Sequence, residues 1–155
     1  MEAVRGVRDS SVRLAGALAN VATLLRSTRL TDPRGTMNSD VILKRFEQPD
    51  EVRQMVKGRF ELVHIGGLTI GRATYEPGWR WSEHVGPGVG QSRCGVEHVG
   101  LVVSGTATAA FADGCVIELR AGELFYIPPE PHDSWVVGDQ PYVSLHFLGA
   151  DHYAR

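Results

Sequence analysis

Histidine and cysteine are the residues of this sequence whose side chains could do metal chemistry, because both can bind a metal ion. The 155 residues include six histidines and two cysteines, Cys94 and Cys115. Neutral imidazole is a good ligand for zinc, iron, nickel and copper. A catalytic metal ion commonly uses three protein ligands and leaves one position open. Which of these side chains could meet around one ion depends on the elements that carry them.

Other kinds of chemistry have no motif in the sequence. It contains no nucleophile motif, phosphate-binding loop or zinc-finger spacing. A net charge of -2 without a basic stripe gives nucleic-acid binding no electrostatic support. No apolar run approaches the roughly 18 residues that a membrane span needs. The composition, with 43% apolar and 22% charged residues, is typical of a soluble protein, and we expect reduced thiols and a cytoplasmic location.

Short strands separated by turns are predicted from residue 60 onward. Glycine and proline, at 18 and 8 residues, punctuate short apolar segments. The expected strands are residues 60–65, 68–75, 79–85, 99–103, 106–112, 115–119, 124–127, 134–137 and 142–148. A regular row of short strands favours a β-sandwich or a closed barrel. No second apolar block follows, so we expect one β domain over residues 37–155.

Residues 1–36 differ from the rest of the chain. Six arginines against three acidic residues give them a charge of +3 and leave -5 for the remainder. Their apolar residues at three- and four-residue steps are Val12, Ala15, Leu18, Val21, Ala22 and Leu25. This spacing predicts a short amphipathic helix, so the extension is helical or else disordered. It could be an accessory helix or a tail upstream of a start at Met37, a targeting peptide, or a helix that binds a partner.

Part of the sequence resembles the second conserved motif of the cupin superfamily. Gly122–Pro128 matches the start of that motif, and His132 takes its histidine position. The usual second glycine is missing, and the histidine comes one residue early. The stretch Glu76–Val85 also looks like part of one uncharacterised subgroup of small bacterial cupins. The resemblance covers about residues 40–149.

The first cupin motif is degenerate, and two registers fit it. In the first register, Gly78 is followed after five residues by His84, and His98 stands where the family has glutamate. The rival register starts at Gly86 and keeps the spacing, but it replaces both histidines, the second of them by Cys94. We prefer the first register because it retains a histidine ligand.

The resemblance implies an all-β fold, the cupin jelly-roll barrel or double-stranded β-helix, here with a short N-terminal helical extension. It also implies one divalent metal ion (iron, zinc, manganese or nickel) held by His84, His98 and His132 from separate strands. Neighbours on a strand point to opposite faces. Arg80 would therefore face inward together with His84, and the alternative is that Glu83 faces inward instead.

Around the metal we expect a pocket for a small molecule. Its lining residues are expected to be Trp81, Cys94, Phe125 and His146. Tyr126 and Arg80 are the candidates for catalytic polar contacts. Cys94 could also approach the metal as a thiolate, whereas Cys115 is expected in the core. Asp133 could orient an imidazole or lie exposed.

Three classes of function follow from the resemblance. The first is a metal-dependent enzyme for a small molecule, with oxygenase, isomerase, cyclase or lyase chemistry at a three-histidine site. The second is a module that binds or senses a small molecule without catalysis, which the degenerate first motif favours. The third is a metal-free structural barrel. We expect a homodimer in all three cases, and no nucleic-acid or membrane partner.

Overall fold

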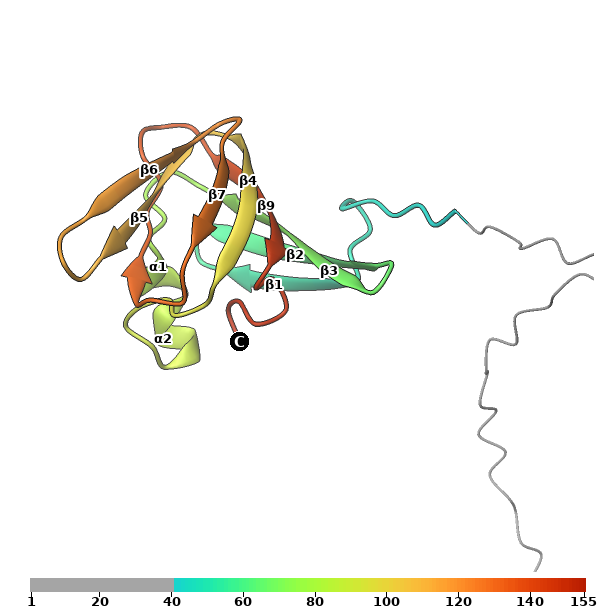
Figure 1. The fold of residues 1–155 in the computed structure, drawn as a ribbon, viewed down its shortest axis with the longest axis horizontal. Coiled ribbons are helices and arrows are strands. Elements are labelled where there is room, and N and C mark those ends of the chain that lie inside the picture. Colours follow the sequence, from blue (N-terminus) through green and yellow to red (C-terminus); the bar gives the residue numbers. More distant parts are fainter. Residues whose placement is uncertain (1–40) are drawn as a thin grey trace, which may run out of the picture. The chain divides into compact units, whose positions relative to one another are not determined.

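The computed structural model describes residues 41–155, so the helix predicted within residues 1–36 lies outside the described part. The strands are β1 (Glu51–Met55), β2 (Gly58–Ile65), β3 (Leu68–Tyr75), β4 (His98–Ser104), β5 (Thr106–Phe111), β6 (Val116–Arg120), β7 (Leu124–Ile127), β8 (His132–Asp133) and β9 (Tyr142–Leu148). Two one-turn helices, α1 (Trp81–His84) and α2 (Gly86–Val89), lie between β3 and β4 (Figure 1). No helix in this part of the chain is long and apolar enough to cross a membrane.

The strands form two antiparallel sheets. The larger sheet has the order β1-β2-β3-β9-β4-β7 and the smaller one the order β6-β5-β8. A bridge between Arg80 and Trp135 joins the segment before α1 to the smaller sheet. From β3 onward the chain therefore passes repeatedly from one sheet to the other, which is the winding of a jelly roll. The predicted all-β jelly roll is confirmed.

Apolar side chains from both sheets fill the space between them. Phe60 and Leu62 of β2 are fully buried, and Val102 of β4 and Ala107 of β5 are each only 1% exposed. Side chains of this kind pack against one another rather than against water, which stabilises the pair of sheets by roughly 25 cal/mol for each Å² of apolar surface removed from solvent. The core lies between the sheets and surrounds the site described below.

Alternation along β4 and β9 brings two imidazoles into this interior. On β4, His98 and Val102 are buried while the intervening Leu101 is partly exposed. On β9, Ser144 and His146 are buried in the same alternating pattern. Because successive side chains of a strand point to opposite faces, the register of each strand fixes its imidazole on the inner face.

The hairpin of β2 and β3 forms as its sequence predicts. Ile65 pairs with Leu68, so Gly66 and Gly67 make a two-residue turn with φ angles of 58° and 81°. Positive φ at both central residues matches the right-handed twist of the strands, and glycine adopts it without steric cost.

The strand predicted over residues 79–85 is wrong. The chain forms α1 there, because the carboxylate of Asp133 accepts hydrogen bonds from the backbone nitrogen of Ser82 at 3.0 Å and from its hydroxyl at 2.9 Å. Strand alternation therefore does not apply. Trp79 and Trp81, which would have faced outward if His84 faced inward on a strand, are both buried.

Three smaller differences concern short or edge elements. Strand β1 was not predicted. The strand expected over residues 134–137 is reduced to isolated bridges at Trp135 and Val136, and the two-residue strand β8 lies just before it. Cys115 is exposed rather than in the core, because it immediately precedes β6, an edge strand of the smaller sheet with mostly exposed residues.

Gly100 tests how closely β4 packs against its neighbours. A Cβ atom there would overlap the carbonyl oxygen of Leu145 and the ring of Phe125. We expect Gly100→Ala to lower the free energy of unfolding by about 1–3 kcal/mol, because overpacking a filled core forces the backbone apart. Urea unfolding measures the change. Gly95→Ala is the control, since a Cβ there meets nothing within 4 Å, and equal midpoints for the two variants would contradict this packing.

Candidate metal centre

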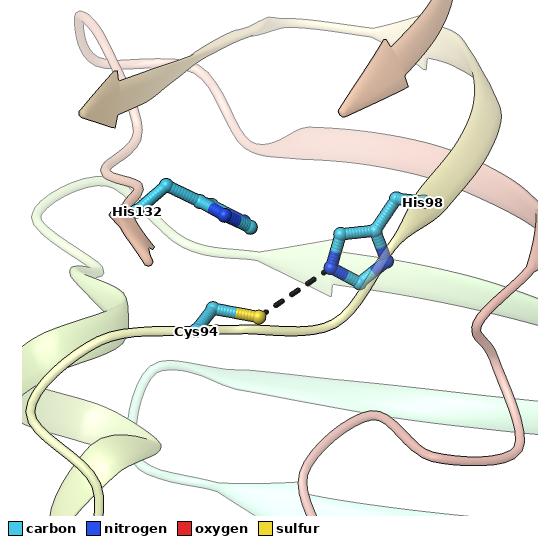
Figure 2. Close-up of side chains that lie close together, drawn as sticks. All are labelled: Cys94, His98 and His132. Atoms are coloured by element: carbon cyan, nitrogen blue, oxygen red, sulfur yellow. Dashed lines mark hydrogen bonds between the residues drawn. The ribbon is translucent and has the colours of Figure 1, made fainter. Parts of the chain in front are cut away.

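Three buried side chains with metal-binding atoms meet between the sheets. The ligand atoms of Cys94, His98 and His132 all lie within 4.8 Å of one another. In Figure 2 the three side chains point toward a common space, His98 from β4, His132 from β8 and Cys94 from the loop before β4. The three residues could therefore hold one metal ion.

Backbone pairing sets the positions of two of these residues. Cys94 and His132 form an antiparallel bridge in which each backbone nitrogen donates to the other's carbonyl oxygen at 2.9 Å. Four residues later the chain enters β4 with His98, whose Nε2 atom lies 3.5 Å from the Cys94 sulfur. The loop and two strands thus converge on one point.

Hydrogen bonding distinguishes the two ring nitrogens of each imidazole. His132 Nδ1 lies 2.7 Å from the carbonyl oxygen of Glu130. A carbonyl only accepts, so Nδ1 carries the proton and Nε2 keeps a free lone pair, which is the usual arrangement of a metal-binding histidine. His98 Nε2 faces the thiol, and its Nδ1 is buried without a hydrogen-bond partner among residues 41–155.

Burial keeps all three groups uncharged in the metal-free protein. It lowers the pKa of His98 to about 2, with smaller contributions from the neighbouring His146 and His132. Burial also lowers the pKa of His132 and raises the pKa of the Cys94 thiol to about 11. Neutral imidazoles are ready to bind a metal, whereas the thiol must lose its proton to the incoming ion.

The donor set fits a transition-metal ion. Tetrahedral zinc with bonds of about 2.0–2.3 Å places neighbouring ligand atoms roughly 3.6 Å apart. The 3.5 Å between the Cys94 sulfur and His98 Nε2 meets this spacing. A thiolate and two imidazoles suit zinc and iron(II) better than manganese, which prefers oxygen donors.

A small cavity of about 40 Å³ adjoins the three donors. Its lining residues are Tyr75, Trp79, Trp81, Cys94, His98, Leu119, Phe125, Ile127, His132, Ser134, Tyr142, His146 and Tyr153. The walls are mainly aromatic, and no carboxylate belongs to them in the described part of the chain. His146 is buried among these rings with Nε2 3.0 Å from the Ser144 hydroxyl, and burial lowers its pKa to about 4.

Asp133 supports the centre from outside the cavity. Only 3% exposed, its carboxylate accepts hydrogen bonds from Ser82 and Arg80 and lies 3.4 Å from Arg93. Asp133 follows His132 on β8. Its contacts therefore tie β8 both to α1 and to the loop that carries Cys94. The sequence left its role open between orienting an imidazole and lying exposed.

The structure places the predicted site residues in different parts of the molecule. His84 does not join His98 and His132: it lies on α1, with Nδ1 2.9 Å from the backbone of Arg80, and lines a separate groove beside α2. The predicted set of three imidazoles is therefore corrected to two imidazoles and the thiol of Cys94. Cys94 is the residue that the rival register of the first cupin motif places among the ligands.

The remaining predicted residues divide between cavity and surface. Those that line the cavity are Trp81, Cys94, Phe125 and His146. Tyr126 is 61% exposed and hydrogen-bonds to Glu97. Arg80 lies over the ring of Trp135 and pairs with Asp133, so neither of the two predicted catalytic residues reaches the cavity.

Sequence reasoning missed Tyr142 and Tyr153, two of the three tyrosines that line the cavity. The hydroxyls of Tyr75 and Tyr153 lie 2.7 Å apart in the interior, and burial raises both pKa values. Tyr153 belongs to the last five residues of the chain, and nothing in its local sequence indicates that it folds back into the core.

The strand order defines a jelly roll, and the buried donors give it a candidate site for one metal ion. No protein-family model matches the chain, and no curated protein proved similar to it. Similar solved structures include a protein of unknown function from Rhizobium leguminosarum bv. viciae 3841, 21% identical over 58% of this chain and 78% of its own, with a TM-score of 0.45.

Two further similar structures are cupin proteins. Oxalate decarboxylase from Lactobacillus farciminis, in a formate complex, is 15% identical with a TM-score of 0.46, over 64% of this chain and 30% of its own. Procruciferin, an 11S globulin from Brassica napus, is 17% identical with a TM-score of 0.48, over 68% of this chain and 30% of its own. Likenesses of this degree say nothing about activity.

The two cysteines should differ sharply in reactivity. Cys94 is 3% exposed, and burial raises the pKa of its thiol, whereas Cys115 is exposed. Because the thiolate is the reactive form, we expect one fast and one slow thiol when the chelator-treated, folded protein meets an alkylating reagent. Cys115→Ser should keep only the slow reaction and Cys94→Ser only the fast one. Equal rates for both would contradict the burial of Cys94.

The buried histidines should make the metal-free protein sensitive to acid. The imidazole of His146 has a pKa of about 4 in the folded protein and about 6.5 in the unfolded chain. Between these two pH values it binds a proton only when the protein unfolds. The contribution of this imidazole to the free energy of unfolding is therefore fully present above about pH 6.5. Below that pH it falls by about 1.4 kcal/mol per pH unit. His146→Phe should show a shallower fall of the free energy of unfolding between about pH 6.5 and 4.

Phe125→Leu is the control for this experiment, because its ring lies 5.5 Å from that of His146 but does not titrate. We expect it to lower stability at every pH without changing the slope. Urea unfolding over a pH series measures both variants. The same slope in His146→Phe as in the unaltered protein would refute a buried, neutral imidazole at this position.

Proposed function

We propose that this chain binds one zinc or iron(II) ion through Cys94, His98 and His132, and that the centre acts as an enzyme on a small molecule. One observation carries the proposal: three buried ligand atoms within 4.8 Å of one another beside a cavity. Buried titratable groups with shifted pKa values beside a cavity are typical of functional sites.

The chemistry follows from the donor charges. Two neutral imidazoles and one thiolate leave a divalent ion with a net charge of +1 in an apolar pocket. When bound, such an ion acts as a Lewis acid and lowers the pKa of a bound water. The protein's part is to keep the imidazoles neutral and oriented and to exclude bulk water by its aromatic walls.

The size of the cavity restricts the substrate. A buried water needs at least about 10–15 Å³, so about 40 Å³ accommodates roughly three water-sized groups. A small substrate with few non-hydrogen atoms fits this volume, whereas a large planar one requires side chains to move.

Binding or sensing without turnover is the second candidate function. A general base works best when its pKa lies near the working pH. Burial moves the lining groups away from neutrality, with a pKa of about 4 for His146 and about 12 for Tyr142. Consumption of small aldehydes, carboxylic acids and oxygen by the metal-loaded protein, followed by NMR and oxygen uptake, separates an enzyme from a binding module.

Elemental analysis of the protein without a histidine tag tests the metal site. We expect one ion per chain, and more than about a hundred-fold weaker metal binding in His98→Ala and His132→Ala, because loss of a direct ligand exceeds the usual effect of losing a supporting residue. His84→Ala is the matched control and should keep its metal. Equal metal content in all three variants would overturn the proposal.

Cobalt substitution tests the thiolate separately. A Co(II)-loaded protein should show a sulfur-to-metal charge-transfer absorption that Cys94→Ser lacks. Cys115→Ser should retain the absorption, since Cys115 is exposed and is not among the three clustered donors. An unchanged spectrum in Cys94→Ser would mean that the sulfur is not a ligand.

A further inference from the structure

Unpaired polar atoms gather around the cavity. Among residues 41–155, four buried side-chain nitrogens have no hydrogen-bond partner: Trp79 Nε1, Trp81 Nε1, His98 Nδ1 and His146 Nδ1. All four residues line the cavity next to the metal-binding atoms. Buried polar groups in proteins are nearly always paired, so their concentration at one place indicates a missing partner at that place.

The chemistry of these atoms says what that partner offers. An indole nitrogen can only donate a hydrogen bond. If His98 binds a metal through Nε2, its proton is on Nδ1, which then also donates. The cavity therefore presents at least three donors and calls for a ligand that is rich in acceptors, which excludes ammonium groups and other ligands that only donate.

We propose that the cavity binds a small carboxylate or a similar oxyanion, whose oxygens accept hydrogen bonds from the indole nitrogens of Trp79 and Trp81. This inference rests on the proposed function, because the net +1 charge of the bound ion would balance the anion in an apolar site. The volume of about 40 Å³ limits the ligand to roughly three or four non-hydrogen atoms, as in formate or acetate.

Titration of the metal-loaded full chain with formate and acetate tests the proposal, with formamide and acetamide as neutral counterparts of the same shape. We expect saturable binding of the carboxylates, at least about ten-fold tighter than that of the amides, because hydrogen bonds to charged groups are the stronger ones. Calorimetry gives the dissociation constants. Equal binding of amides and carboxylates, or no saturable binding, overturns the proposal.

Three tryptophans provide a matched set of variants. Trp79→Phe and Trp81→Phe remove one donor each and should weaken acetate binding about ten- to a hundred-fold. Trp135→Phe is the control, because this ring packs on Arg80 and does not line the cavity. Equal weakening in all three variants contradicts the proposal.

Indole N–H resonances of the unaltered protein decide the matter even where a variant does not fold. Acetate should shift the signals of Trp79 and Trp81 and leave that of Trp135 in place. A shift confined to Trp135, or no shift at saturating acetate, overturns the inference.

The metal content of the same samples separates this inference from the proposed function. Bound metal without carboxylate binding refutes the inference and leaves the metal site standing. Absence of metal refutes the proposed function. Acetate binding to that metal-free protein, lost in Trp81→Phe, would still support the carboxylate site, and absence of binding would refute it.

Discussion

The backbone bridge between Cys94 and His132 is the contact on which the candidate site depends. Its two hydrogen bonds, both 2.9 Å long, join a loop to a two-residue strand that lies 38 positions further along the chain. Directly opposed residues of an antiparallel pair have Cβ atoms about 4.5–5.5 Å apart. That separation suits two ligands of one ion, and Asp133 reinforces it by holding β8 to α1 and to Arg93.

The unpaired nitrogens beside this bridge are expensive for a domain of this size. A buried polar group left without any partner costs about 1–3 kcal/mol, so four such nitrogens in one place require a partner inside the cavity. Apolar rings in place of Trp81 or His146 would pack the same space without that cost. Local features that oppose stability are typical of functional sites, because function and not folding requires them.

Much of the fold could be predicted from local sequence. The β2–β3 hairpin, β7 and β9 follow from alternation and turn residues, and alternation also places His98 inside. The segment over residues 79–85 could not be predicted, since its turn depends on Asp133, 51 residues away from Ser82 in sequence. Because this turn is not visible in the local sequence, motif spacing alone assigned His84 to the metal site. The tertiary structure shows that His84 lies in another groove.

The corrected register also changes the kind of metal that the site should prefer. The cupin pattern to which the sequence is similar supplies histidines and one glutamate, and here Cys94 stands at a histidine position and His98 at the glutamate position. Ser92, at the remaining histidine position, is exposed. A bound ion would therefore still meet one anionic ligand, a soft thiolate in place of a hard carboxylate. This exchange favours zinc or iron(II) over manganese, and it leaves three protein ligands, the number at which an ion keeps a position for a substrate.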